Sequence, residues 1–185
     1  MNQALVFASI ILGVAISDQI LSLHRLLRSD APIRWHWAQP WFAMIVLLLN
    51  VMIWWSLASG DDARLTIGGF LPLLVTLILL ALLTASTLPD RIDIGGVDLA
   101  AYYQSNRRYQ WTLLTLALAW QLGGDIIEGV SAWAELPSLL YDRAVDIIVL
   151  VVMIAMAFIR RWWLVAIGMA LLSTGPIGWL LRSIG

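Results

Sequence analysis

Six apolar stretches, separated by short polar connections, form the pattern of the sequence. A helix needs about 20 apolar residues to cross the hydrocarbon core of a bilayer, and each stretch reaches or approaches that length. We therefore predict an all-α fold, a single transmembrane domain over residues 1–185 that forms a polytopic bundle of six transmembrane helices. The expected helices are Ala4–Leu27, Trp41–Ala58, Ile67–Leu88, Trp111–Ile127, Leu139–Ile159 and Trp162–Leu181. The fourth stretch is short, so we expect its helix to extend in both directions.

The composition supports lipid as the solvent for much of the surface. The chain is 61% hydrophobic and only 12% charged, whereas a soluble domain is nearer half apolar and a quarter charged. A net charge of −1 offers no basic field for nucleic acid. The sequence has no cysteine and only two histidines, His24 and His36. Disulfides, thiolate metal sites and multi-histidine metal centres are thereby excluded, and we expect no metal and no cofactor.

The arginines predict how the helices are oriented. Basic residues favour the cytoplasmic connections of membrane proteins. Eight of the eleven arginines lie on alternate connections, after the first, third and fifth helices. These are Arg25, Arg28, Arg34, Arg91, Arg107, Arg108, Arg160 and Arg161. We therefore expect these connections in the cytoplasm and both termini outside. The first stretch has no basic residue before it, so we expect a retained helix rather than a cleaved signal peptide.

The first helix carries a polar stripe. Asp18, Ser22 and Arg25 have the i, i+4, i+7 spacing of one helical face. A charge at membrane depth costs about 2.5–3.5 kcal/mol, so this face should point into the bundle. Asp18 and His24 could pass protons, since histidine titrates near neutral pH. We favour the simpler alternative, in which Asp18 pairs with an arginine such as Arg108.

A second polar set is predicted in the outer half of the bundle. It consists of Gln121, Asp125 and Glu128 on the fourth helix, and of Arg143 and Asp146 on the fifth. In one interpretation helices three to six surround a polar cavity, where the carboxylates hold a cation or relay protons. In the other, which we favour, Arg143 neutralises Asp125 or Asp146 and locks the helices together.

The longest connection, Pro89 to Gln110, is expected to be partly helical. Gly95-Gly96 is a break, Asp98 can cap a helix, and the residues that follow predict a helix that runs towards the fourth span. Four of its side chains would then lie near anionic headgroups: Tyr102, Tyr103, Arg107 and Arg108. We interpret them as an interfacial anchor, with a specific lipid or partner site as the alternative.

Several of these motifs together resemble a known family. They are Asp18 with Leu23-His24-Arg25-Leu26-Leu27, Trp54-Trp55, Leu88-Pro89-Asp90, and Asp98-Leu99 with Tyr102-Tyr103 and Arg107-Arg108-Tyr109. The chain is similar in these to a family of small, uncharacterised six-span proteins of bacterial inner membranes. The resemblance implies a multi-pass protein of the inner membrane, and it carries over no activity and no site residue.

The sequence contains no catalytic motif. H-E-x-x-H, G-x-S-x-G and a phosphate-binding glycine loop are all missing, so we expect no enzyme. We predict a structural or accessory subunit that binds lipids or membrane proteins, or that forms a homo-oligomer. The alternative is a small ion channel or an ion- or proton-coupled transporter, with a polar site between helices one, four, five and six.

Overall fold

The computed structural model describes residues 3–59, 67–129 and 141–184. The predicted helical fold class is confirmed. The helices of the described ranges are α1 (Gln3–Leu27), α2 (Ala38–Ser59), α3 (Ile67–Ala85), α4 (Leu99–Gly129), α6 (Ala144–Met156) and α7 (Trp162–Ile184), accompanied by two very short strands, β1 (Ile33–Arg34) and β2 (Val97–Asp98). Three helical segments are long and apolar enough to cross a membrane: Leu5–Leu27, Ala38–Ser59 and Trp162–Arg182.

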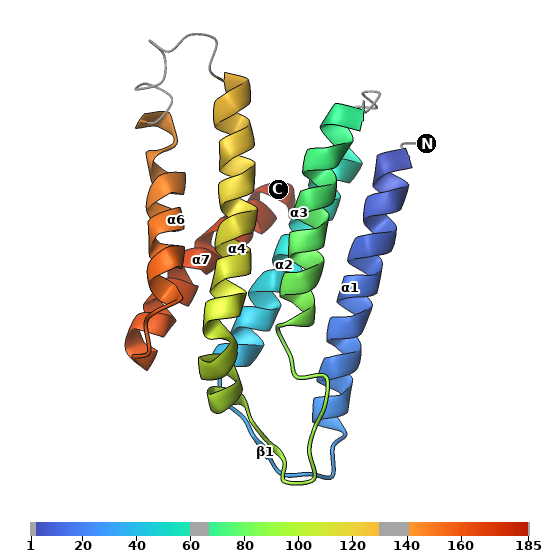
Figure 1. Ribbon diagram of the computed structural model, residues 1–185, viewed down its shortest axis with the longest axis vertical. Coiled ribbons are helices and arrows are strands. Elements are labelled where there is room, and N and C mark those ends of the chain that lie inside the picture. Colours follow the sequence, from blue (N-terminus) through green and yellow to red (C-terminus); the bar gives the residue numbers. More distant parts are fainter. Residues whose placement is uncertain (1–2, 60–66, 130–140, 185) are drawn as a thin grey trace.

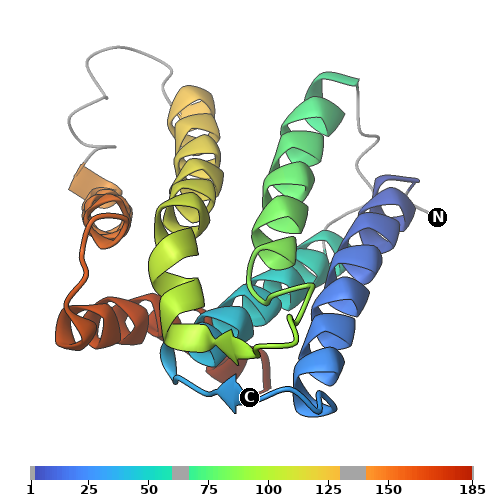
Figure 2. The ribbon, with the colours of Figure 1, turned by 60° about the horizontal axis from the view of Figure 1, so that its bottom comes forward.

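Helices that follow one another along the chain alternate in direction (Figure 1). In Figure 1, α1, α3, α4 and α6 stand side by side, and α2 lies behind them in contact with α1, α3 and α4. Figure 2 shows α7 running across the bundle towards α2, against which it packs. The connections 28–37, 86–98 and 157–161 all lie at the lower end of the molecule in Figure 1. We call the end formed by these connections, together with the first turns of α4, the basic end.

Apolar side chains fill the space between the helices and also cover the outside. The core includes Leu12 of α1, Phe42 of α2, Leu77 of α3 and Trp111 of α4, all fully buried. Other large apolar side chains point outward, and more than thirty of them are exposed. An apolar surface of this extent normally meets lipid or another protein, because it is poorly solvated by water.

The longest helix, α4, begins well before the predicted fourth span. The carboxylate of Asp98 accepts the backbone N–H groups of Ala100 at 2.9 Å and Ala101 at 3.1 Å. This is an N-terminal cap, which satisfies donors that have no partner within a helix. The helix then continues through Gly123 and Gly124 without a break. The predictions of a cap at Asp98 and of a helix leading into the fourth span are confirmed.

A parallel pair of two-residue strands, which the sequence did not predict, joins two connections at the basic end. Ile33 is paired with Val97 and Arg34 with Asp98. The pairing brings the backbone of Gly96 against Pro32, and a Cβ atom on Gly96 would lie 1.9 Å from the Pro32 carbonyl oxygen. Gly96 also has a φ of 87°, a conformation that favours glycine.

Some helix boundaries differ from the prediction. The third helix ends at Ala85 rather than Leu88, and the second begins at Ala38 with Pro40 in its first turn, where proline is tolerated. The fifth predicted span is represented by α6, which has 13 residues and ends at Met156 rather than Ile159. Its predicted start, Leu139, lies outside the described residues.

Candidate functional site

The polar stripe of α1 faces the connection after α3. The Ser22 hydroxyl donates to a carboxylate oxygen of Asp90 at 3.1 Å, and Arg25 donates to the backbone carbonyl of Asp90 at 3.2 Å. Gln19, buried on the same helix, donates to the carbonyl of Ala43 in α2 at 2.7 Å. Ser22 is thus turned inward, as predicted, whereas Arg25 stays exposed. Both side chains bind α1 to the connection after α3, and Gln19, outside the stripe, binds it to α2.

Asp18, on the same stripe, is not paired with Arg108. Its side chain is half-buried and makes neither a hydrogen bond nor an ion pair with the described part of the chain. The guanidinium of Arg108 instead lies over the ring of Phe158, 5.7 Å from its centroid. The predicted pairing fails because α3 lies between α1 and α4.

The carboxyl end of α3 is held by side chains from other helices. The Ser86 carbonyl accepts hydrogen bonds from Gln110 at 2.6 Å and from Tyr102 at 3.2 Å, and Gln39 donates to the carbonyl of Thr87. The last carbonyl groups of a helix have no partner within it, so these donors satisfy groups that would otherwise be buried unpaired. Sequence reasoning missed Gln39 and Gln110, whose only signal is a polar amide next to an apolar stretch.

Further along α2, Asn50 connects α2 with α3. Its amide donates to the hydroxyl of Thr84 at 2.9 Å and to the carbonyl of Val46 at 2.8 Å. The bond to Thr84 links α2 to α3, and the side chain of Asn50 is fully buried. The polar groups between α1, α2, α3 and α4 thus serve mainly to connect helices.

The two predicted interfacial tyrosines point into the bundle. Tyr103 is fully buried, accepts a hydrogen bond from the Trp111 indole at 2.9 Å and packs on Trp162 with ring centroids 5.8 Å apart. Burial raises the pKa of Tyr103 to about 12, although the hydrogen bond from Trp111 and the charge of Arg107 oppose the shift. Tyr103 therefore cannot contact a headgroup, and the Tyr102 hydroxyl is engaged by Ser86.

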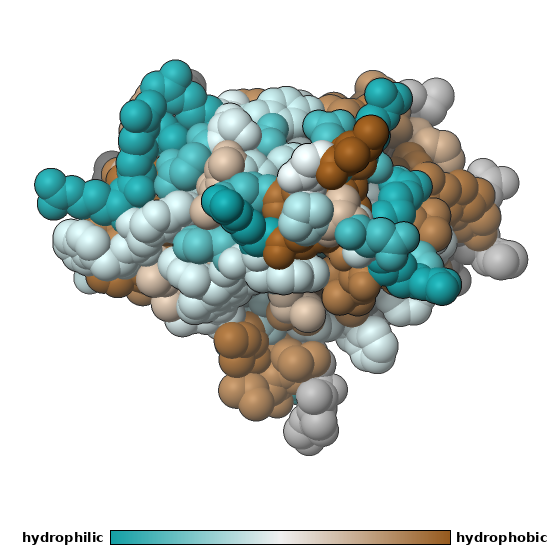
Figure 3. Space-filling view, turned by 90° about the horizontal axis from the view of Figure 1, so that it is seen from below, coloured by the Kyte–Doolittle hydropathy of each residue, from teal (hydrophilic) through white to brown (hydrophobic). Residues whose placement is uncertain are grey.

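The arginines of the same segment form a cationic cluster at the basic end. The Arg107 side chain is only 5% exposed and donates to the backbone and side-chain oxygens of Gln104 at 3.0 and 2.8 Å. Its burial and the positive charges of Arg160 and Arg108 lower the pKa of Arg107. None of these three arginines forms an ion pair with a carboxylate in the described ranges. Seen from below, hydrophilic side chains spread over this end of the molecule (Figure 3).

A groove of about 270 Å³ opens beside this cluster, between α4 and the carboxyl end of α6. Arg108 forms one end of it, and the remaining wall is mainly apolar. The wall residues are Thr112, Thr115, Leu116, Ile154, Ala157 and Phe158. Among the predicted site residues, only Arg108 reaches this groove.

The predicted outer polar set is only partly described. Gln121 is exposed on α4, while the side chains of Asp125 and Glu128, on the same helix, lie outside the described residues. Arg143 and Asp146 approach to 3.6 Å and are each less than half exposed, at 43% and 44%. Arg143 thus pairs with one of the two acids expected for it, but the pair lies within one stretch of chain around the start of α6 and does not itself join two helices.

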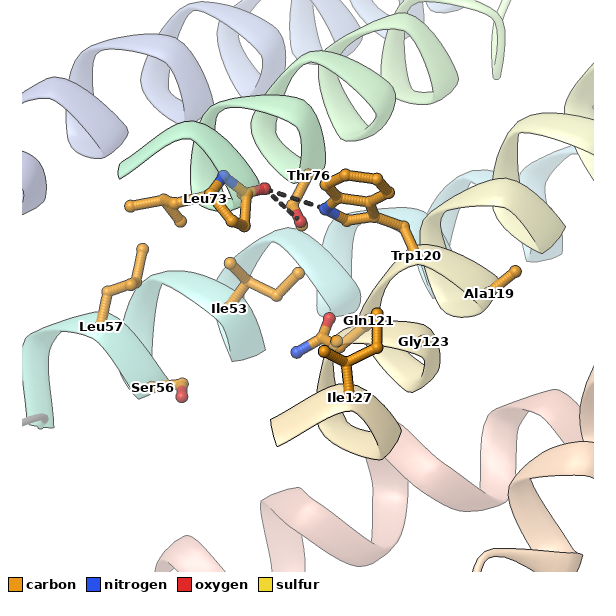
Figure 4. A pocket seen from close by; sticks show the side chains of 12 residues that line it. Ile53, Ser56, Leu57, Leu73, Thr76, Ala119, Trp120, Gln121, Gly123 and Ile127 are labelled. Carbon is orange, nitrogen blue, oxygen red and sulfur yellow. Dashed lines mark hydrogen bonds between the residues drawn. The ribbon is translucent and has the colours of Figure 1, made fainter. Parts of the chain in front are cut away.

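Gln121 lines a pocket that differs in its walls from the polar cavity considered above. It has a volume of about 610 Å³ and lies between α2, α3 and α4, with Ile53, Leu73 and Ile127 among its walls (Figure 4). Trp120 closes one side and donates its indole N–H to the carbonyl of Pro72 at 3.1 Å. The walls are largely apolar and come from α2 in place of helices five and six.

Neither the comparisons nor the local chemistry assigns an activity. No protein-family model, curated protein or solved structure matches the chain. In the parts of the chain that the structure describes, histidine and acidic side chains form no group of three that could hold a metal ion. The remaining guide to function is that polar side chains between the helices are hydrogen-bonded to neighbouring segments, whereas the arginines of the basic end have no carboxylate partner among the described residues.

Proposed function

We propose that the protein is an accessory subunit of the bacterial inner membrane, which crosses the bilayer six times and binds lipids or other membrane proteins. Three helical segments have the length and apolar character of membrane spans. Helices that alternate in direction, with the arginine-rich connections at one end, are what a six-span protein with a cytoplasmic basic end requires. The inner membrane is the location that the sequence resemblance implies.

The observation that carries this proposal is where the polar groups are engaged. Between the helices, Gln19, Gln39, Asn50 and Gln110 donate to backbone or side-chain oxygens of neighbouring helices. At the basic end, in contrast, the arginine cluster has no carboxylate partner among the described residues. The interior is built to hold the bundle together, and the exposed members of the cluster, Arg108 and Arg160, are suited to an external anionic partner.

Purification in native membrane discs tests the proposal. The tagged chain is expressed at low level and extracted with a styrene–maleic acid copolymer, and its proteins and lipids are identified by mass spectrometry. We expect either a membrane protein in constant ratio to the chain or enrichment of anionic phospholipid over the bulk membrane. An unrelated six-span protein, extracted in parallel, sets the background. Recovery of nothing above this background contradicts the proposal.

A small proton-coupled transporter is the second candidate, supported by one observation. Asp18 is half-buried within an apolar helix and has no hydrogen bond or ion pair with the described residues. An ionisable residue within a membrane helix is a candidate for a proton path. Purified protein in liposomes with an enclosed pH dye distinguishes the two functions. An accessory subunit gives no proton flux, whereas a transporter gives a flux that Asp18→Asn abolishes.

A further inference from the structure

We infer that the groove between α4 and α6 binds one anionic phospholipid, with its phosphate at Arg108 and one acyl chain along the apolar wall. This inference rests on the proposed membrane function and specifies its site and its lipid class. It also assigns a role to Thr112, Leu116 and Phe158, which the sequence did not single out.

The groove has the polarity gradient of a lipid molecule. Arg108 is exposed at the basic end, and Thr112 and Leu116 follow at one-turn intervals along α4. Leu116 is thus about 12 Å further along the helix, at 1.5 Å per residue. Across the groove, Phe158 lies near the Arg108 end and Ile154 one turn deeper. A charged head followed by an apolar chain matches this order.

The size of the groove favours a single chain. Its volume of about 270 Å³ is below the range of roughly 300–1,000 Å³ typical of pockets that enclose a drug-sized ligand. Leu116, Ile154 and Phe158 remain 50%, 48% and 65% exposed, so the groove is open along its side. One acyl chain can therefore lie in the groove while the second chain stays in the surrounding bilayer.

The positive charge at the end of the groove favours an anionic ligand. Arg108 is positioned by the Phe158 ring, a contact that leaves its N–H groups free to donate. Arg107 and Arg160 add positive charge nearby, and the described residues supply no carboxylate to balance it. A phosphate accepts charge-assisted hydrogen bonds from arginine, and basic pockets between membrane helices on the cytoplasmic side are known sites of anionic headgroups.

A second helix fits the groove less well than a lipid does. Helices in membranes pack closely where small side chains line the contact. Here Thr112, Thr115 and Ala157 are small, but Leu116, Ile154 and Phe158 on the same wall are bulky and exposed. A flexible acyl chain can follow such a branched and aromatic surface, whereas a rigid helix is held away from it.

Native mass spectrometry tests the inference on the whole purified chain. The protein is equilibrated with equal amounts of phosphatidylglycerol and phosphatidylcholine that carry the same acyl chains, and the retained lipid is counted. We expect one phosphatidylglycerol in preference to phosphatidylcholine. Arg108→Gln should reduce this preference about fivefold, as expected for the loss of one cation near an anionic headgroup, and Arg108→Lys should retain most of it.

Two further variants separate the groove from general surface charge. Arg28→Gln removes the same charge from an exposed residue at the α1 side of the basic end and should leave the preference unchanged. Thr112→Trp fills the groove from an exposed position and should reduce retention of both lipids. Tryptophan fluorescence melting curves that match the unsubstituted chain verify that each variant is folded.

Three outcomes overturn the inference. Equal losses in Arg108→Gln and Arg28→Gln would mean that surface charge alone attracts the lipid. Retention unaffected by Thr112→Trp would place the lipid elsewhere, and a dimer abolished by Thr112→Trp would identify the groove as a contact between two copies. In each case the proposed accessory function stands, because it depends on enrichment of a partner in native discs and not on this groove.

Discussion

At the scale of single residues, Gly96 controls how closely two connections approach each other. Its backbone lies against Pro32, and the N–H of the next residue, Val97, donates to the Pro32 carbonyl at 3.2 Å. Its positive φ also favours glycine. Position 96 therefore imposes both a conformational and a steric requirement, whereas a Cβ atom on Gly95 would meet nothing within 4 Å.

Gly96→Ala should destabilise the protein. The new methyl group meets the Pro32 carbonyl, and a residue other than glycine in this conformation costs about 1–3 kcal/mol. We expect the free energy of unfolding, measured by tryptophan fluorescence in mixed micelles of increasing dodecyl sulfate content, to fall by at least this amount. Gly95→Ala is the matched control and should change little. Equal effects of the two substitutions would contradict the close approach.

Local spacing was a good guide to some residues and a poor one to others. The cap at Asp98 and the burial of Ser22 could be predicted, because the first depends on capping chemistry and the second on helical periodicity. The roles of Gln39 and Gln110 could not, since each depends on where the carboxyl end of α3 arrives in three dimensions. The burial of Tyr103 was missed for the same reason. A tyrosine near the start of a membrane helix is usually interfacial, and the burial of this one depends on which side chains pack around it in three dimensions.

At the scale of elements, the carbonyl groups at the carboxyl end of α3 accept hydrogen bonds from side chains of α2 and α4. Gln110 and Tyr102 both donate to the Ser86 carbonyl. Either donor alone can satisfy this acceptor, so the two should act redundantly. The Gln110 side-chain oxygen is itself buried and makes no hydrogen bond with the described residues, so replacing this amide removes an unpaired group as well as a bond.

A double-mutant cycle on Gln110→Leu and Tyr102→Phe should therefore be strongly non-additive. Each single substitution leaves Ser86 one donor and should cost little. The double substitution leaves a buried carbonyl unpaired, at a cost of about 1–3 kcal/mol beyond the sum of the singles. The measurement is again unfolding in mixed micelles. Tyr109→Phe, at an exposed position of the same helix, is the control that should not couple with Gln110→Leu. Simple additivity in the first pair would refute the shared acceptor.

Helices could be predicted more reliably than their ends. Long apolar stretches gave α1, α2, α3, α4 and α7, because a helix satisfies its own backbone in a lipid environment. The ends depend on contacts that the local sequence does not contain, such as the pairing of β1 with β2 and the capping of α3 by α2 and α4. The continuous α4 was the exception, because Asp98 marks its start in the sequence.

At the scale of the whole molecule, the placement of the connections can be tested directly. The chain has no cysteine, so single introduced cysteines can be labelled without background. Asp30 and Ile94 are exposed at the basic end, and Ser59 and Tyr141 are exposed at the other end. With a membrane-impermeant maleimide, cysteines at Asp30 and Ile94 should react only in inverted vesicles, and cysteines at Ser59 and Tyr141 only from outside intact cells. Reaction of the Asp30 and Ile94 variants from opposite sides would contradict the six-span arrangement.

The general form of the bundle was accessible from composition and arginine spacing, but its contact map was not. The sequence left open a polar cavity between helices three to six, and the side chains of Asp125 and Glu128, which would line it, lie outside the described residues. The walls of the described pocket, which come from α2, α3 and α4 and are mainly apolar, could not be read from the sequence. Which helices become neighbours depends on side-chain packing over the whole assembly. Here α3 separates α1 from α4, which prevents the expected pairing of Asp18 with Arg108.

The pairing of β1 with β2 has a consequence for how the protein is made. Ile33 can pair with Val97 only after Val97, which is 64 residues later in the chain, has been synthesised. At about 5–20 residues per second, a ribosome needs roughly 3–13 s to synthesise that distance. During this time α2 and α3 are synthesised while the two connections are still unjoined. The two connections therefore cannot join until the start of α4 emerges, and their close approach then depends on a single glycine, Gly96. The third connection of the basic end, 157–161, is synthesised later still.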